Sequence, residues 1–178
     1  MNMRLILGLG LGLLAGILSV ARPSSAQSSA ALAHTDRTFE FIAFAPMSRV
    51  APLFGAARER DWSPEWNPIF VWPDSPGDRV GMVFTVAHGH RASVWVNTQY
   101  DLEHGRFQYV YVIPDVMATL LTLTLQPHEA HTIVRVRYER SALSADASSI
   151  VESMAQQDDR AAPDWERQVN SYLKQARD

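Results

Sequence analysis

The segment RERDWSPEWNP, residues 58–68, has a composition that suits neither a regular helix nor a regular strand. Pro64 and Pro68 fix the backbone φ angle and lack an N–H, so they interrupt backbone hydrogen bonding. Trp62 and Trp66 bring large apolar rings, each with one N–H that needs a polar partner when it is buried. We therefore predict a structured loop that its two tryptophans hold against a core.

Four charged residues open this loop, and their role has more than one interpretation. They form either a buried ion network that anchors the loop, or a mouth that recognises carboxylates through Arg60. The third interpretation, which we favour, is a set of solvated surface pairs. The residues are Arg58, Glu59, Arg60 and Asp61.

Two elements are expected before the loop. Residues 38–44 (TFEFIAF) are rich in aromatic and β-branched side chains, and predict a first strand that ends before Pro46. Ser48 is placed to cap a short helix that leads directly into the loop. The apolar residues of this helix recur at helical spacing: Val50, Leu53, Phe54 and Ala57.

Beyond the loop the sequence predicts a sheet. A short strand is expected at 69–72, followed by the turn-forming sequence PDSPGD at 73–78. The connections between the later segments are short, so neighbouring strands are expected to run antiparallel. Alternation of apolar and charged residues in the last segment predicts one buried and one exposed face. The five later segments are 80–86, 92–102, 106–113, 116–125 and 132–140.

The segment 144–174 is predicted to be a helix that covers the buried face of the sheet. Pro163 interrupts its pattern: it either kinks one helix or opens a second helix, with Asp164 and Glu166 in the first turn. Both interpretations stay open at this point. The apolar stripe, at a spacing of about 3.6 residues, consists of Ile150, Met154, Ala161, Trp165, Val169, Tyr172 and Leu173.

The composition of the chain fits one globular domain, with 178 residues, 47% hydrophobic and 20% charged. We expect this domain to span residues 38–176, after a flexible lead-in at 27–37. A net charge of -3 without clustered basic residues disfavours a nucleic-acid partner. The lack of cysteine excludes disulfides, thiol nucleophiles and thiolate zinc ligands. With Lys174 as the single lysine, Schiff-base chemistry is also disfavoured.

Residues 1–26 are predicted to be a signal peptide. After a positive start, residues 5–20 form an apolar run, and the sequence SSA that ends at Ala26 offers small residues for cleavage. The alternative is a membrane anchor, but a span needs about 20 apolar residues and this run has about 16. We therefore expect a periplasmic or secreted protein without a stable membrane span after cleavage.

The order of these elements and four motifs resemble the START-like, or Bet v 1-like, superfamily, in particular the bacterial SRPBCC group labelled polyketide cyclase/dehydrase. The resemblance covers about residues 38–175. It implies an α+β helix-grip fold, in which a curved antiparallel sheet wraps around a long C-terminal helix, with a short helical segment after the first strand. The motifs are RERDW at 58–62 with a following Trp and Pro, GMVFT at 81–85, VWVNTQYD at 94–101 and YERSAL at 138–143.

The resemblance also implies a cavity between sheet and helix, because members of the superfamily bind lipids, sterols, polyketides or other apolar molecules. Some members catalyse aromatic ring closure or dehydration. Aromatic side chains suit flat or apolar ligands and are the expected lining. Tyr109 and Tyr111 either offer phenolic hydrogen bonds to a ligand or pack in the core. The other expected lining residues are Trp62, Trp66, Trp95, Trp165 and Tyr172.

A polar row follows Trp95 along one predicted strand, at Asn97, Gln99 and Asp101. Such a row usually faces solvent on a one-sided sheet. If it faces the cavity instead, Asn97 and Gln99 would orient a ligand carbonyl, and Asp101 would be a candidate general base with a pKa raised by burial. Both orientations stay open.

Two histidine pairs, His88 with His90 and His128 with His131, resemble metal-ligand pairs. Both fall in predicted hairpin turns, where exposed polar residues are expected, and no carboxylate-rich third ligand site accompanies them. We predict neither a metal site nor a cofactor.

Three functions are compatible with these features. The first is an exported protein that binds a small apolar or aromatic molecule without converting it. The second is an enzyme of the cyclase/dehydrase kind that uses Asp101 or a tyrosine as acid or base. The third is a structural envelope protein with a filled pocket. We favour the first, because the sequence offers no nucleophile and base at a diagnostic spacing.

Overall fold

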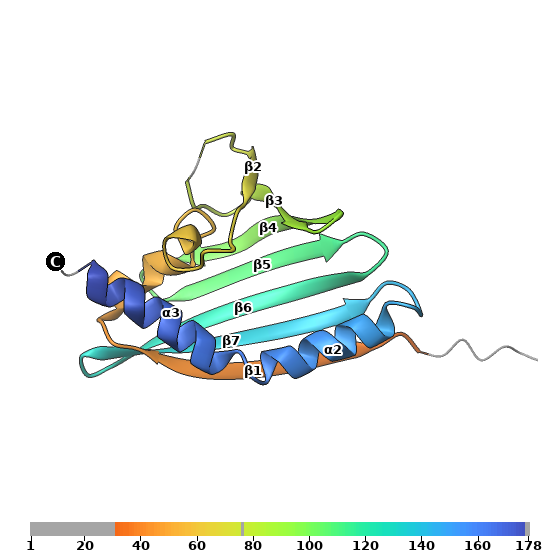
Figure 1. Ribbon diagram of the computed structural model, residues 1–178. Coiled ribbons are helices and arrows are strands. Elements are labelled where there is room, and N and C mark those ends of the chain that lie inside the picture. Colours follow the sequence, from red (N-terminus) through yellow and green to blue (C-terminus); the bar gives the residue numbers. More distant parts are fainter. Residues whose placement is uncertain (1–30, 76, 177–178) are drawn as a thin grey trace, which may run out of the picture.

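A seven-stranded sheet forms the body of the protein in our computed structural model, which describes residues 31–75 and 77–176 (Figure 1). Every neighbouring pair in the sheet is antiparallel, in the order β1-β7-β6-β5-β4-β3-β2. The predicted α+β class is confirmed. The strands are β1 (His34–Ala43), β2 (Ile69–Trp72), β3 (Val83–His88), β4 (Arg91–Asp101), β5 (Arg106–Ile113), β6 (Met117–His128) and β7 (His131–Ala142).

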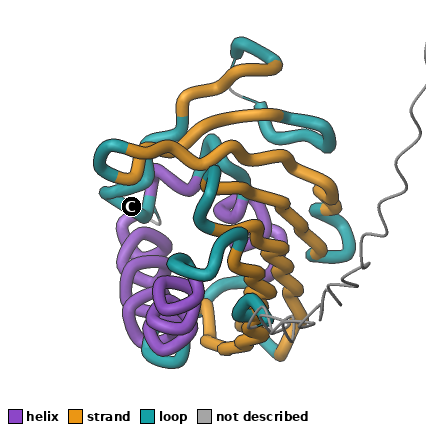
Figure 2. The backbone as a smooth tube through the Cα atoms, turned by 90° about the vertical axis from the view of Figure 1, so that its right-hand side faces the viewer, coloured by secondary structure: helices purple, strands orange, loops and turns teal. Residues whose placement is uncertain are grey.

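The helices gather on one side of the sheet (Figure 2). A short helical stretch follows β1, as expected, and two helices follow β7 along the β1 and β7 side (Figure 1). Pro163 stands in the first turn of the second of these, so it opens a new helix and does not kink a continuous one. The helical elements are α1 (Met47–Val50), η1 (Ala51–Phe54), η2 (Glu59–Asp61), α2 (Ser148–Asp158) and α3 (Ala162–Gln175).

Two side chains of helix α3 form hydrogen bonds with backbone groups at the end of β1. The N–H of Ile42 donates to the Glu166 carboxylate at 3.2 Å, and the N–H of Phe44 donates to Asn170 Oδ1 at 2.7 Å. Asn170 in turn donates from Nδ2 to the carbonyl of Ile42 at 2.8 Å. Strand β1 lies at an end of the sheet, so these contacts occupy backbone groups that no neighbouring strand pairs.

Helix α2 is held to β7 by a buried ion pair. The guanidinium of Arg140 donates to both carboxylate oxygens of Asp158, with Nη2 to Oδ1 at 3.1 Å. The same guanidinium lies over the ring of Tyr138, 4.0 Å from its centroid. A carboxylate and an aromatic face therefore compensate the cost of burying this arginine.

Several local expectations were wrong. Strand β1 begins at His34, so residues 34–37 of the expected lead-in pair with β7. The short helix after Pro46 has no side-chain cap, and Ser48 lies inside it. In α2 the buried apolar residues are Val151 and Ala155, whereas Ile150 is 45% exposed, so the apolar stripe is displaced by one position.

The predicted signal peptide, residues 1–26, its cleavage after Ala26 and most of the lead-in lie outside the described residues. Among the helices that are described, none is long and apolar enough to cross a membrane.

Candidate functional site

An aromatic cavity of about 50 Å³ lies between the sheet and α3. Seven of its eleven lining residues are aromatic, and they come from the loop, the central strands and α3. This volume holds about three or four water molecules. The lining residues are Phe54, Ala56, Glu59, Trp66, Phe84, Trp95, Tyr109, Leu121, Leu123, Tyr138 and Trp165.

The loop contributes Trp66 to this cavity. Its indole N–H donates to the carbonyl of Ala56 at 2.8 Å, which supplies the polar partner that a half-buried tryptophan needs. Its ring packs edge-on against Trp95 at 5.4 Å and against Phe84 at 5.9 Å, measured between centroids. The loop is thus fixed to the sheet through the side chain that lines the cavity.

Strands β4 and β5 place the next pair of rings. The Trp95 indole N–H donates to Ser93 Oγ at 2.7 Å, and the Tyr109 hydroxyl donates to the carbonyl of Phe54 at 2.8 Å. The polar atoms of both side chains are therefore already bonded to protein. In this conformation the two residues offer ring surface to a ligand, and the Tyr109 hydroxyl becomes available only if its bond to Phe54 opens.

Glu59 is the one carboxylic acid in the cavity lining. Burial raises the pKa of Glu59 from its ordinary 4.5 to about 8, and the negative charge of Asp78 adds to the rise. The side chain keeps some contact with solvent. At neutral pH, Glu59 is therefore mainly a neutral acid that can both donate and accept a hydrogen bond.

Asp78 supports the segment that carries Glu59. Its Oδ1 accepts the backbone N–H of Ala57 at 3.0 Å. Burial raises the pKa of Asp78, although backbone N–H groups oppose the rise. Burial likewise raises the pKa of the Tyr109 and Tyr138 hydroxyls well above the usual value. These phenols stay protonated at physiological pH.

Two of the predicted lining residues join the loop to α3 and do not line the cavity. Trp62 is 6% exposed and packs on Trp165 with ring centroids 5.3 Å apart. The Tyr172 hydroxyl accepts from Arg58 at 3.0 Å, and Arg58 also pairs with Asp61 at 2.8 Å. Since these two loop charges lie at the surface, the interpretation as solvated pairs holds for them.

A bulge between Asn97 and Gln99 corrects the predicted polar row. Asn97 pairs with Tyr109 in β5 and is 0% exposed. Gln99 pairs with Gln108, and its side chain lies on the other face of the sheet from Asn97. The extra residue changes which face the following side chains occupy, so Asn97 is inside while Gln99 and Asp101 are outside.

Asp101 is unsuited to the role of a buried base. It caps the hairpin after β4, where its carboxylate accepts the backbone N–H of His104 at 3.0 Å and pairs with the His104 ring at 2.9 Å. The backbone N–H of His104 is the main reason why the pKa of Asp101 lies below its usual value. The condition set for a general base at Asp101, a side chain that faces the cavity with a raised pKa, is therefore not met.

Tyr111 and Asn97 are buried beside the cavity, outside its lining. The Tyr111 ring stacks on Trp95 with centroids 4.0 Å apart, so it supports a lining residue from behind. The Asn97 amide is buried, and neither of its polar atoms has a hydrogen-bond partner among the residues that the structure describes. Of the nine residues predicted to contact a ligand, the structure brings Trp66, Trp95, Tyr109 and Trp165 together around the cavity.

Glu59 was not predicted to line a cavity, because the four charges at the start of the loop were interpreted together as surface pairs. One signal was available. Glu59 lies three positions before the buried Trp62, a spacing that places two side chains on the same face of a helical turn. The inward direction of Tyr138 followed from its alternation with charged residues, but it was not connected with ligand contact.

The histidine pairs lie at the hairpin ends where they were expected. His88 ends β3 and its ring lies 2.9 Å from Ser93 Oγ, and His128 pairs with His131 across the β6-β7 hairpin. Within residues 31–75 and 77–176, no three His, Cys, Asp or Glu side chains are grouped so that they could hold a metal ion.

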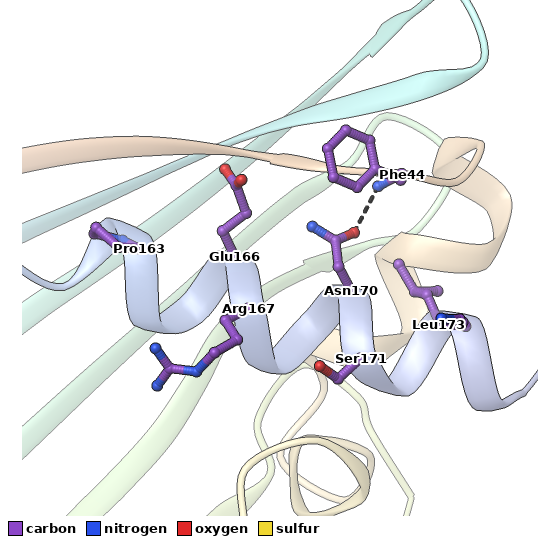
Figure 3. Close-up of a pocket in the computed structure, with 8 residues that line it drawn as sticks. Phe44, Pro163, Glu166, Arg167, Asn170, Ser171 and Leu173 are labelled. Carbon is purple, nitrogen blue, oxygen red and sulfur yellow. Dashed lines mark hydrogen bonds between the residues drawn. The ribbon is translucent and has the colours of Figure 1, made fainter.

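A larger hollow of about 630 Å³ lies on the surface between Phe44 and α3 (Figure 3). Its wall includes Glu166 and Asn170, whose polar atoms already bond the backbone of β1. Figure 3 shows Asn170 directed at Phe44, while Arg167 projects away from the strand. The aromatic cavity is the better candidate site, because its carboxylic acid takes no part in holding the fold.

Comparisons with known proteins support the fold assignment. No protein-family model matches the chain, and no curated protein matches its sequence. Norcoclaurine synthase from Thalictrum flavum, in complex with dopamine and hydroxybenzaldehyde, has a TM-score of 0.60 at 14% identity over 98% of each chain. An uncharacterised protein from Rhizobium leguminosarum has a TM-score of 0.58 at 14% identity, over 81% of this chain and 97% of that one.

The structure of Ara h 8.0201 is also similar to this chain, with a TM-score of 0.56 at 10% identity over 80% of this chain and 99% of that one. Identities this low carry information on the fold alone. Together with the sheet and the helices that pack on it, they define a Bet v 1-like helix-grip fold. The C-terminal helix of the prediction is here divided into α2 and α3.

Proposed function

We propose that the protein is an exported START-like binding protein that holds a small apolar or aromatic molecule between its sheet and α3. The observation that carries this proposal is the cavity itself, a mainly aromatic lining around one carboxylic acid that no fold contact uses. A concave apolar site with few polar groups is the general form of a small-molecule pocket. Norcoclaurine synthase, which shares the fold, is bound to dopamine and hydroxybenzaldehyde in its structure.

The size of the cavity limits the ligand. A drug-sized molecule needs about 300–1,000 Å³, and an engineered apolar cavity of about 150 Å³ binds benzene. From about 50 Å³, the cavity must widen before a complete aromatic ring can enter. Trp66 is the tryptophan that the loop contributes to the lining, so widening at this point requires its hydrogen bond to Ala56 and its packing on Trp95 and Phe84 to open.

Ligand retention tests this proposal. Native mass spectrometry of protein purified from the periplasm of the cells that make it should detect an additional apolar mass. An Ala56→Val variant, which adds two methyl groups to the wall of the cavity, should lose that mass while keeping its circular dichroism spectrum. If the wild-type protein carries only its polypeptide mass and binds no apolar probe, the pocket is a filled structural core.

Acid-base catalysis is the second candidate function, and the raised pKa of Glu59 favours it. A group with a pKa of about 8 exchanges protons readily near neutral pH, as a general acid or base must. Glu59 replaces Asp101 as the candidate residue, with Tyr138 as a neighbouring proton donor. A Glu59→Gln variant that retains ligand but accumulates it unconverted would favour catalysis. Equal composition of the retained molecules in both proteins would favour binding alone.

A further inference from the structure

Glu59 lines the cavity, and its carboxyl group has no partner among the described residues. In the part of the chain that the structure describes, no hydrogen bond or ion pair involves this side chain. The lining residues include two phenols, Tyr109 and Tyr138, but no arginine, lysine or histidine. A carboxyl group that is partly withdrawn from water in a mainly apolar wall costs stability when it has no partner, so its presence calls for a physical explanation.

The basic residues next to Glu59 are engaged elsewhere. Arg58 pairs with Asp61 at 2.8 Å and donates to the Tyr172 hydroxyl at 3.0 Å. The guanidinium of Arg60 lies over the Phe70 ring, 5.8 Å from its centroid. Both neighbouring cations are thus engaged with other groups and do not pair with Glu59.

The rest of the lining suits a positive charge as well. Trp66, Trp95 and Trp165 line the cavity, and the face of an indole ring attracts cations more strongly than that of a tyrosine or phenylalanine. The Trp95 ring already stacks on Phe84 and Tyr111, so the indoles left to contact a cation are those of Trp66 and Trp165. Aromatic cages of this kind recognise quaternary ammonium groups. With room for about three or four water molecules, the cavity must widen for a methylated ammonium group as it must for an aromatic ring.

We propose that the aromatic cavity selects a small organic ammonium ion, whose positive nitrogen pairs with the Glu59 carboxylate while its methyl groups contact the surrounding rings. This inference rests on the proposed binding function and adds to it the charge of the ligand. A neutral apolar molecule would fill the same space but would leave the acid unpaired.

The proposal requires a specific pH dependence. The titratable groups around Glu59 are Asp78, before β3, and the phenols of Tyr109 and Tyr138. The phenols stay neutral over the relevant range, and Asp78 keeps the proton affinity of Glu59 high. Since Glu59 is protonated below a pH of about 8, a permanent cation must displace that proton. The affinity for the cation should therefore increase by up to about tenfold for each unit that the pH rises towards about 8, and should become constant above it.

Two probes of the same shape and different charge test this. Choline carries a quaternary nitrogen where 3,3-dimethylbutan-1-ol has a neutral carbon, and titration calorimetry at pH 6.5, 7.5 and 8.5 measures both. Choline should bind at least about tenfold tighter at the highest pH than at the lowest, as the proton linkage requires. The alcohol should bind equally at all three.

Matched variants locate the effect. Glu59→Gln should weaken choline binding at pH 8.5 by at least about tenfold, abolish its pH dependence and leave the alcohol unaffected. Glu65→Gln removes an exposed acid from the same loop and should change neither probe. Circular dichroism melts of each variant establish that it is folded.

The outcomes separate this inference from the binding proposal. If the alcohol binds the wild-type protein as tightly as choline at pH 8.5, the preference for a cation is wrong and the apolar pocket stands. If choline binds equally to the Glu59→Gln variant, the carboxylate is not its partner and the inference falls. If neither probe nor any apolar molecule binds, the inference falls together with the proposed function.

Discussion

The indole N–H of Trp62 donates to the backbone carbonyl of Leu53 at 2.7 Å, and this bond folds the tryptophan loop back onto the helical segment before it. Four positions later, Trp66 makes the equivalent bond to the carbonyl of Ala56. The loop is therefore fastened twice to the same short stretch of backbone. The Trp62 ring also packs on Trp165 of α3, and the Trp66 ring lines the cavity.

We predict that Trp62→Ala lowers the free energy of unfolding by about 3–5 kcal/mol, the cost of truncating a buried tryptophan. The ring packs on Phe54 and Trp165, and its loss also leaves the Leu53 carbonyl without this donor. Urea unfolding measures the change. Trp72→Ala is the control, since that ring is 56% exposed and its removal should cost less than about 1 kcal/mol. A loss below about 1 kcal/mol for Trp62→Ala would show that the loop is not anchored.

The pKa of Glu59 predicts how stability depends on pH. The unfolded chain releases this proton near the ordinary value of 4.5, whereas the folded protein retains it up to a pH of about 8. Protons therefore favour the folded state between these values, and stability should decrease as the pH rises from about 4.5 to 8 and then become constant.

The size of this effect follows from the same values. The full difference between the two pKa values of Glu59 corresponds to a stability change of at most about 5 kcal/mol. The partial solvent contact of Glu59 should reduce this change to about 1–3 kcal/mol. Unfolding in urea at pH 5, 6.5 and 8 measures it. In Glu59→Gln this contribution should disappear, so that the variant is more stable than the wild type at pH 8. An identical pH profile in both proteins would contradict the raised pKa.

Loss of the buried ion pair between Arg140 and Asp158 should cost much more stability than loss of an exposed ion pair. Asp158→Asn leaves a buried guanidinium without its anion, and we expect a loss of about 3–5 kcal/mol in unfolding free energy. The matched control is Asp36→Asn, which breaks the exposed pair with Arg137 and should cost much less, because solvent screens that pair. Equal losses in the two variants would mean that burial of the first pair has no energetic consequence.

Gly105 and Gly89 provide a comparison of backbone strain with steric overlap. Both have a φ of 61°, which costs a residue with a side chain about 1–2 kcal/mol. A Cβ at Gly105 would lie 2.9 Å from the Leu125 carbonyl oxygen, whereas a Cβ at Gly89 would meet nothing within 4 Å. Gly105→Ala should therefore cost about 1–3 kcal/mol more than Gly89→Ala, the usual penalty of overpacking. Thermal or urea unfolding of the two variants decides this.

The architecture of this protein was predictable because its patterns are local. Short hairpin connections required antiparallel neighbours, and β2 and β5 have the predicted bounds. The sequence did not decide whether Pro163 kinks one helix or begins a second helix, because the geometry of proline is compatible with both. The structure resolves it through the turn at residues 159–161 that separates α2 from α3.

The candidate site was only partly predictable, for two physical reasons. A bulge adds one residue to β4 and reverses the facing of every later side chain, and nothing in the period-two pattern around Thr98 marks its position. The environment of Glu59 depends on residues distant in sequence, such as Asp78 and Tyr138. Its charge state follows from that tertiary setting and not from its neighbours in the loop.

The bonds from α3 to the end of β1 have a consequence for how molecules of this protein meet one another. While Asn170 and Glu166 occupy the backbone groups of Ile42 and Phe44, a strand from another molecule cannot pair there. Release of α3 would uncover a sheet edge as well as loosen a helix. Damage to this contact should therefore appear first as aggregation that depends on protein concentration, before any loss of the sheet itself.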